Sequence, residues 1–141
     1  MTTTAGTSNP VVALLSNDDD LARIVASAVE IPWRFQRHFY TGGLLDFLQI
    51  AGVRLVIVDD ELVSQSDRSW LLAQVRRNLA NADLLYVAGT HSIENERRAR
   101  GNGAQYYTAK PIDAGELIEV LKGFMNRSKS AVPIVPRPQP R

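Results

Sequence analysis

Two adjacent carboxylates, Asp59 and Asp60, end one of the most apolar stretches of the chain. The stretch from Val53 to Val58 is interrupted only by Arg54, and such a run is typical of a strand that is buried on both faces. Ionised groups are costly to bury. The acids are therefore expected either in a solvated turn or at the rim of a pocket that uses negative charge.

Polar residues also follow the other short apolar runs of the chain. Asp18 comes shortly after the first run, Thr90 after the fourth, and Lys110 directly after the fifth. A carboxylate, a hydroxyl and an ammonium group are the parts of a phosphoryl-transfer site that lacks a glycine-rich loop, because the carboxylate accepts the group and the other two stabilise its oxygens. The candidates are Asp59 as acceptor, with Lys110 and Thr90 as stabilising residues.

Helical spacing separates these apolar runs. After the first run, apolar residues recur at intervals of three and four, from Leu21 to Val29, which is typical of one helix face. Similar spacing recurs between the later runs, so five strands alternate with five helices. The strands are expected at residues 10–15, 34–40, 53–58, 84–88 and 105–109, and the helices at 21–29, 44–51, 70–79, 92–100 and from about 113.

This alternation predicts an α/β fold with one doubly wound parallel sheet. Each pair of parallel neighbours needs a crossover helix, and crossovers are right-handed, so helices should cover both faces of the sheet. Ligands of such sheets bind beyond the carboxyl ends of the strands. We therefore expect Asp18, Asp59, Thr90 and Lys110 to converge on one rim.

The composition bounds the organisation of the chain. Its 141 residues suit one domain, and 16 Lys plus Arg against 15 Asp plus Glu give a net charge of +1, which indicates no nucleic acid as a direct partner. The chain has no cysteine, which excludes disulfides and thiolate chemistry. No apolar run is long enough to span a membrane, and the first residues do not resemble a signal peptide, so a cytoplasmic protein is expected.

We expect a disordered lead-in at 1–9, the domain at 10–128 and a Pro-rich mobile tail at 129–141.

In this order the segments resemble the receiver domains of bacterial two-component response regulators. VVALLSNDDDLARIV is similar to their first strand and helix, RLVIVD to the third strand with its acceptor aspartate, and GAQYYTAKPIDAGELIEVLKGFM to the last strand and helix. The resemblance covers Val11 to about Arg127 and implies a five-stranded flavodoxin-like sheet of order 2-1-3-4-5. It also implies that Asp59 is the phospho-acceptor, that Lys110 stabilises the phosphoryl group, and that Tyr107 is the switch aromatic.

The resemblance further implies a signalling module in a phosphorelay, and not an enzyme. Its partner would be a sensor histidine kinase or another signalling protein, and Lys110-Pro111 would be a cis peptide, which only an X–Pro bond adopts at low cost. The expected docking or homodimer face consists of the polar helix at 92–100, the strand at 105–109 and the last helix. The expected contacts on this face are Arg97, Arg98, Arg100 and Tyr107.

The pocket departs from the receiver pattern at the end of the first strand. Receivers carry two acids there to hold magnesium. When this sequence is aligned with the receiver pattern without gaps, Ser16 and Asn17 stand at these positions. Neutral groups supply no charge for a hard cation. We therefore expect Mg2+ to bind weakly, through Asp18 and Asp59, or not at all.

The hydroxyl position and the acids after Asp59 are less well defined. An ungapped count back from Gly103 gives Ala88, and not Thr90, at the position where receivers have a hydroxyl, so both assignments stay open. Asp60 and Glu61 are expected to be solvated charges of a turn.

Two alternative functions also stay open. One is a pseudo-receiver, which would act as an interaction scaffold without phosphoryl chemistry. The other is an aspartyl phosphatase of the haloacid-dehalogenase type, because Asp59 with Glu61 loosely resembles its paired acids and Lys110 its lysine. That family has its nucleophile on the first strand, and the pattern is absent here.

Overall fold

The computed structural model describes residues 9–49, 52–79 and 81–130. Five parallel strands form one sheet in the order β2-β1-β3-β4-β5, which confirms the predicted α/β class and strand order. Among these residues, no helix is long and apolar enough to cross a membrane. The strands are β1 (Val11–Leu15), β2 (Arg34–His38), β3 (Val53–Asp59), β4 (Asp83–Ala88) and β5 (Tyr106–Ala109).

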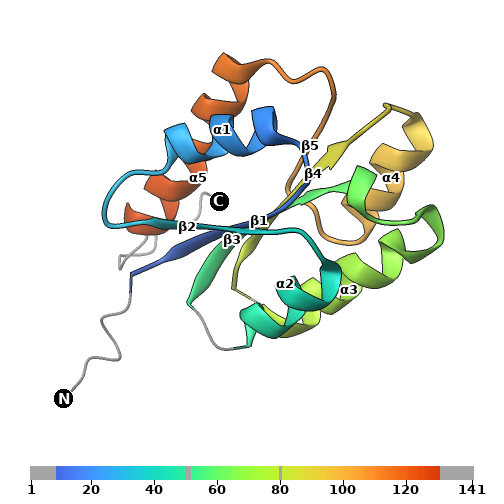
Figure 1. Cartoon of the computed structure of the whole chain (residues 1–141), viewed down its shortest axis with the longest axis horizontal. Helices are drawn as coiled ribbons and strands as arrows, with labels where there is room; N and C mark the ends of the chain where they lie inside the picture. Colours follow the sequence, from blue (N-terminus) through green and yellow to red (C-terminus); the bar gives the residue numbers. More distant parts are fainter. Residues whose placement is uncertain (1–8, 50–51, 80, 131–141) are drawn as a thin grey trace, which may run out of the picture.

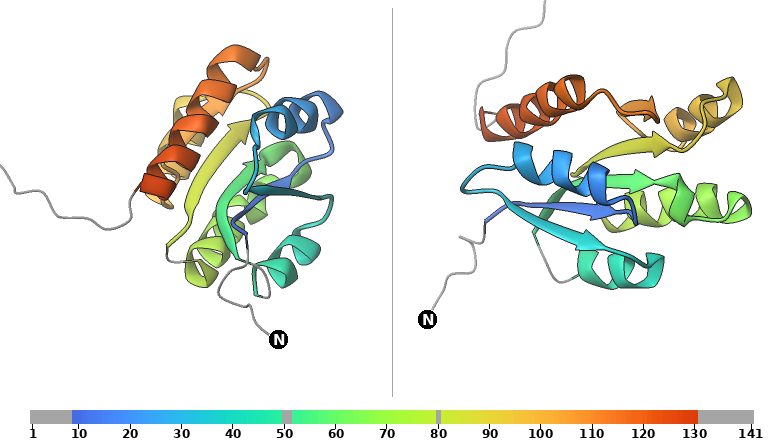
Figure 2. Two further views of the ribbon diagram at one scale, coloured as in Figure 1. Left: turned by 90° about the vertical axis from the view of Figure 1, so that its left-hand side faces the viewer. Right: turned by 45° about the horizontal axis from the view of Figure 1, so that its top comes forward.

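Helices cover both faces of the sheet (Figures 1 and 2). The helices α1 (Asp19–Ala28) and α5 (Ala114–Ser130) lie side by side on one face. The other face is covered by α2 (Thr41–Leu48), α3 (Arg68–Asn78) and α4 (Ile93–Gly101). Two short 3-10 turns, η2 (Asp60–Leu62) and η3 (Gln65–Asp67), connect β3 to α3.

The central strands are buried on both faces because successive side chains point in opposite directions. In β3, Leu55 and Ile57 pack beneath α1 and α5, whereas Val56 and Val58 pack against α2 and α3. The same alternation continues past the end of the strand. It directs Asp59 and the residue after it to opposite sides of the sheet.

Some element boundaries differ from the sequence-based expectation. The strand β2 ends at His38 and not at residue 40, which leaves Tyr40 77% exposed. The helix α5 continues to Ser130, two residues past the expected domain end at 128. Residues 1–8 and 131–141 lie outside the described part of the chain, so the lead-in and the Pro-rich tail stay predictions.

Both cis peptides in the described chain precede proline. Lys110-Pro111 is cis, as the resemblance implied, and Ile31-Pro32 is a second cis bond that the sequence analysis did not predict. The first follows β5 directly, at the carboxyl rim of the sheet.

Candidate functional site

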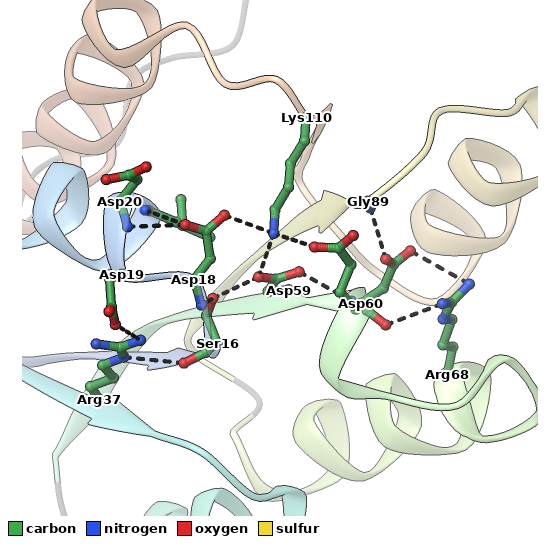
Figure 3. A network of polar contacts seen from close by, with 12 residues as sticks. Ser16, Asp18, Asp19, Asp20, Arg37, Asp59, Asp60, Arg68, Gly89 and Lys110 are labelled. Carbon is green, nitrogen blue, oxygen red and sulfur yellow. Dashed lines mark hydrogen bonds and ion pairs between the residues drawn. The ribbon is translucent and has the colours of Figure 1, made fainter.

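Asp59 is the centre of a polar network at the carboxyl rim of the sheet (Figure 3). It is the last residue of β3 and is only 1% exposed. Its Oδ2 accepts hydrogen bonds from Ser16 Oγ at 2.6 Å and from Lys110 Nζ at 2.9 Å. Its Oδ1 accepts from the backbone N–H of Glu61 at 3.1 Å. Both carboxylate oxygens are therefore bound by groups of the chain itself.

Lys110 joins three carboxylates from three separate segments. Its Nζ lies 2.9 Å from Asp18 Oδ2, 2.9 Å from Asp59 Oδ2 and 2.6 Å from Glu61 Oε1. Burial alone would lower the pKa of the ammonium, but the hydrogen bonds to the carboxylates outweigh it and raise this pKa. The hydrogen bond from the ammonium also lowers the pKa of Asp18. The predicted pairing of Asp59 with Lys110 at the rim is confirmed.

Ser16 supplies the hydroxyl of the site, which the sequence analysis did not foresee. It is buried at the end of β1, donates to Asp59 and accepts from the backbone N–H of Asp18 at 2.9 Å. Asp18 in turn caps α1, because its Oδ1 accepts from the N–H groups of Asp20 and Leu21. The sequence had indicated Ser16 only as a neutral residue at an acidic position. Its side chain points toward Asp59, the candidate phospho-acceptor, and donates a hydrogen bond to it.

Asp60 is buried, and the expectation that it is a solvated turn charge is wrong. It is 2% exposed, with Oδ2 accepting from Tyr86 Oη at 2.7 Å and Oδ1 accepting from the Gly89 N–H at 2.8 Å. The Arg68 guanidinium lies 3.6 Å from its Oδ2. Burial, together with the hydrogen bond to Asp60, raises the pKa of Tyr86. The alternation of β3 could have indicated this burial if it had been extended by one residue.

Glu61 combines an exposed position with a contact to the site. Its side chain is 59% exposed, as expected of a turn residue, but its carboxylate binds Lys110. To do so it crosses over Gly89, where an added Cβ would overlap the Glu61 side chain. The glycine at the end of β4 therefore leaves room for this ion pair.

The two candidates for the hydroxyl from β4 do not supply one to Asp59 in the described contacts. Ala88 is buried and has only a methyl group. Thr90 is exposed, and its carbonyl accepts from the side chain of Asn95 at 3.0 Å. With Asp60 it lines a polar groove of about 350 Å³ beside the Asp59 network. Its predicted stabilising role stays a prediction.

Tyr107 lies beneath the surface between α4 and β4. It is 9% exposed, and its ring stacks on that of Tyr86 with centroids 5.8 Å apart. Its hydroxyl lies 3.0 Å from His91 Nδ1. A continuous set of contacts thus connects Asp60, through Tyr86, to Tyr107 and His91. No pattern in the sequence indicates a role for His91.

The three arginines of the expected partner face lie on α4 in different settings. Arg97 and Arg100 are exposed, whereas Arg98 is half-buried and donates to Asn95 Oδ1 at 3.0 Å. Arg100 also pairs with Glu96 at 2.9 Å. Ile93, 68% exposed, lies with Arg97 and Arg100 along a surface groove of about 530 Å³.

A divalent ion, which receiver-type sites imply, does not fit the donor set of this pocket. Ser16 gives its hydroxyl to Asp59, and Asn17 is exposed. The two expected ligands, Asp18 and Asp59, both bind the Lys110 ammonium. With Lys110 in place, no group of three or more His, Cys, Asp or Glu in the described residues is arranged to hold a metal.

Comparison with solved structures relates this fold to receiver domains. A response regulator from Thermotoga maritima superposes with a TM-score of 0.74 at 18% identity, covering 84% of this chain and 98% of the other. The signal receiver domain of an HD domain-containing protein from Pseudomonas fluorescens Pf-5 gives 0.72 at 21% identity, covering 86% and 98%. A response regulator from Burkholderia pseudomallei, solved with a phosphorylated aspartic acid, calcium ion and citrate, gives 0.67 at 18% identity, covering 90% and 76%.

Comparison of the sequence itself gives no such match. No family model matches it. No curated protein matches it either. The similarity to solved structures therefore concerns the fold, and the chain has the flavodoxin-like fold of response-regulator receiver domains, as the sequence resemblance predicted.

Proposed function

We propose that this protein is a receiver-type module of two-component signal transduction that acts through contacts with other proteins. The observation that carries the proposal is the meeting of Asp59 and Lys110, whose Oδ2 and Nζ atoms are 2.9 Å apart at the carboxyl rim of a receiver fold. Ligands of doubly wound sheets bind at this rim. The receiver domains among its structural neighbours support the same class of function.

In this proposal Asp59 is the phospho-acceptor and a sensor histidine kinase is the donor. A carboxylate oxygen of Asp59 attacks the phosphorus of a phosphohistidine, the P–N bond breaks as the P–O bond forms, and the departing imidazole takes up a proton. Lys110 stabilises the charge of the transferred group, because its ammonium already lies within hydrogen-bonding distance of Asp59. The protein itself then acts as a signalling partner and not as an enzyme.

A phosphorylation-independent pseudo-receiver is the second candidate. It is favoured by the state of Asp59, whose two oxygens are bound by Ser16, Lys110 and the backbone of Glu61 within a buried network. Phosphorylation would have to displace part of this network. No contact in the described residues specifically favours the aspartyl phosphatase alternative.

Acetyl phosphate distinguishes the two candidates. The protein is incubated with acetyl phosphate and Mg2+, and mass spectrometry is used to detect a labile phosphoryl group. Acceptor function predicts a label that is lost in Asp59→Asn and kept in Asp20→Asn, a matched change at an exposed acid. A complete lack of label would favour the scaffold, and a label that persists in Asp59→Asn would overturn the assignment of Asp59.

The partner face in this proposal is the α4–β5–α5 surface, with Ile93, Arg97 and Arg100 as its exposed contacts. Arg and exposed apolar side chains are suited to such an interface. Tyr107 is buried, so it supports this face from below instead of touching the partner.

Charge reversal tests the partner face. Replacing Arg97, Arg98 and Arg100 by Glu should abolish binding to a sensor kinase, or self-association measured by sedimentation. Thermal stability should fall only modestly, through the lost contacts of Arg98 with Asn95 and of Arg100 with Glu96. Arg77→Glu on the exposed side of α3 is the control and should leave binding intact. Binding that survives the triple change but is lost on Arg23→Glu in α1 would show that the face lies elsewhere.

A further inference from the structure

The ammonium of Lys110 lies at the point where three carboxylates meet. Asp18 approaches from the start of α1, Asp59 from the end of β3 and Glu61 from η2, each with one oxygen between 2.6 and 2.9 Å from Nζ. We propose that Lys110 is the resident cation of this pocket and occupies, as part of the chain, the position that a divalent ion would otherwise take. Figure 3 shows the Asp18 and Asp59 carboxylates pointing toward the Lys110 ammonium.

The charges explain why a cation is required there. Asp59 is buried, and an ionised carboxylate without a partner is strongly unfavourable in such a position. The three carboxylates outnumber the single ammonium, and the exposed Glu61 makes the shortest of the three contacts, at 2.6 Å. The negative charge of this cluster favours a cation at its centre, and the lysine supplies one without any ion from solution.

The geometry also predicts what happens when the lysine is removed. The three oxygens would then surround an empty position at 2.6 to 2.9 Å from each of them. Ca2+ binds oxygen at about 2.3–2.6 Å and tolerates irregular ligand sets, whereas Mg2+ requires about 2.0–2.1 Å and near-octahedral geometry. A small contraction of the carboxylates would therefore suit Ca2+ better than Mg2+.

This inference goes beyond the proposed function, because it concerns the cation of the pocket and holds whether or not Asp59 accepts a phosphoryl group. In this inference, Lys110 holds three segments of the rim together without a metal ion. The natural protein should accordingly keep the same stability when divalent ions are removed or added.

The test is a titration with Ca2+ and Mg2+ alone, followed by calorimetry and by the thermal unfolding temperature. The natural protein should show no binding at millimolar ion concentrations and no change on adding a chelator. Lys110→Met should lower the unfolding temperature and gain Ca2+ affinity by at least tenfold, with a smaller gain for Mg2+. Bound ion should restore the lost stability, because a ligand that binds only the folded state stabilises it.

Matched variants separate this effect from a general loss of positive charge. Lys122→Met removes a lysine of α5 that pairs with Glu30 at 3.9 Å, and it should leave ion binding unchanged. Adding Glu61→Gln to Lys110→Met should remove most of the gained affinity. If Lys110→Met is unfolded without metal, Ca2+ should refold it. Lys110→Gln is a milder change, because the glutamine keeps an amide donor, and its ion affinity and unfolding temperature are measured in the same way.

Three results would overturn the proposal. The first is micromolar binding of Ca2+ or Mg2+ by the natural protein that is lost in Asp59→Asn. The second is a folded Lys110→Met variant with no gain in ion affinity. The third is failure of Ca2+ to rescue stability in both Lys110→Met and Lys110→Gln. The phosphoryl-acceptor assay is independent of all three, so the two proposals can fail separately.

Discussion

Two neighbouring acids of this protein belong to different networks. Asp59 faces α1 and the residue that follows β5, where it binds Ser16 and Lys110. Asp60 faces the other side of the sheet, where it binds Tyr86 and the N–H of Gly89. The cause is the two-residue period of an extended chain. One acid is therefore a candidate for chemistry, and the other fixes the end of β4 to the end of β3.

Replacing Asp60 by Asn should destabilise the fold. The change removes the charge that binds Tyr86 and Arg68 in a buried position, and hydrogen bonds to charged groups are worth about 1.5–3 kcal/mol each, so we expect a loss of about 2–3 kcal/mol. Urea unfolding measures it. Asp20→Asn, at an exposed pair with Arg23, should change stability by less than about 0.5 kcal/mol. Equal effects of the two changes would contradict the structural role of Asp60.

Replacing Ser16 and Asn17 by Asp should create magnesium affinity. A carboxylate at position 16 would lie beside the buried Asp59, because the present hydroxyl is only 2.6 Å from its Oδ2. Like charges at this distance destabilise the fold unless a cation lies between them. We expect the double variant to be less stable than the natural protein without metal and to recover on adding Mg2+. Thermal unfolding with and without Mg2+ checks this, and equal curves would contradict it.

The elements of the expected output face differ in how firmly they are packed. The only residue of α4 that is buried is Ala99, and the rest of this helix is polar apart from the exposed Ile93. The helix α5 buries Leu117, Leu121 and Met125 against β3 and α1. A weakly packed helix beside a firmly packed one is a suitable arrangement for a surface that changes on binding or modification.

Hydrogen exchange should reveal this difference between the helices. Local opening of α4 exposes little apolar surface, so its amides should exchange at least about tenfold faster than those in the middle of α5. Mass spectrometry of peptides that cover residues 93–101 and 114–125 measures both rates. Ile93→Ser is the control and should not change α4 exchange, because the side chain is exposed. Slower exchange in α4 than in α5 would contradict the prediction.

The whole molecule should lose stability at alkaline pH. The pKa of Tyr86 is raised by burial and by its hydrogen bond to Asp60, and the pKa of Lys110 is raised because its hydrogen bonds to carboxylates outweigh burial. Both groups hold their protons more tightly in the folded state than in the unfolded state. The stability that they contribute is therefore present below their ordinary values of 10.0 and 10.5 and is lost as the pH rises further.

The free energy of unfolding should accordingly fall as the pH rises above 10.0, the ordinary pKa of tyrosine. Tyr86→Phe should lower the stability at neutral pH but reduce the slope of this fall, because one of the two groups no longer titrates. Urea unfolding at a series of pH values gives both quantities. The same slope in the natural protein and in the variant would show that Tyr86 does not contribute.

The sequence by itself determined the order of strands and helices and the approach of Lys110 to Asp59. Apolar runs and helical spacing are local properties, and parallel strands bring their carboxyl ends to one rim, so both results follow without knowledge of side-chain positions.

Only the tertiary structure decided how the acids after β3 are used. Asp60 meets Tyr86, which is 26 residues away, and Glu61 meets Lys110 at a separation of 49. Such contacts depend on the path of the Glu61 side chain over Gly89 and on how deeply each side chain is buried. Local residue patterns do not encode these properties, because they arise when distant segments pack together. The same packing places the hydroxyl of Ser16, a neutral residue at the end of a strand, where it donates a hydrogen bond to Asp59.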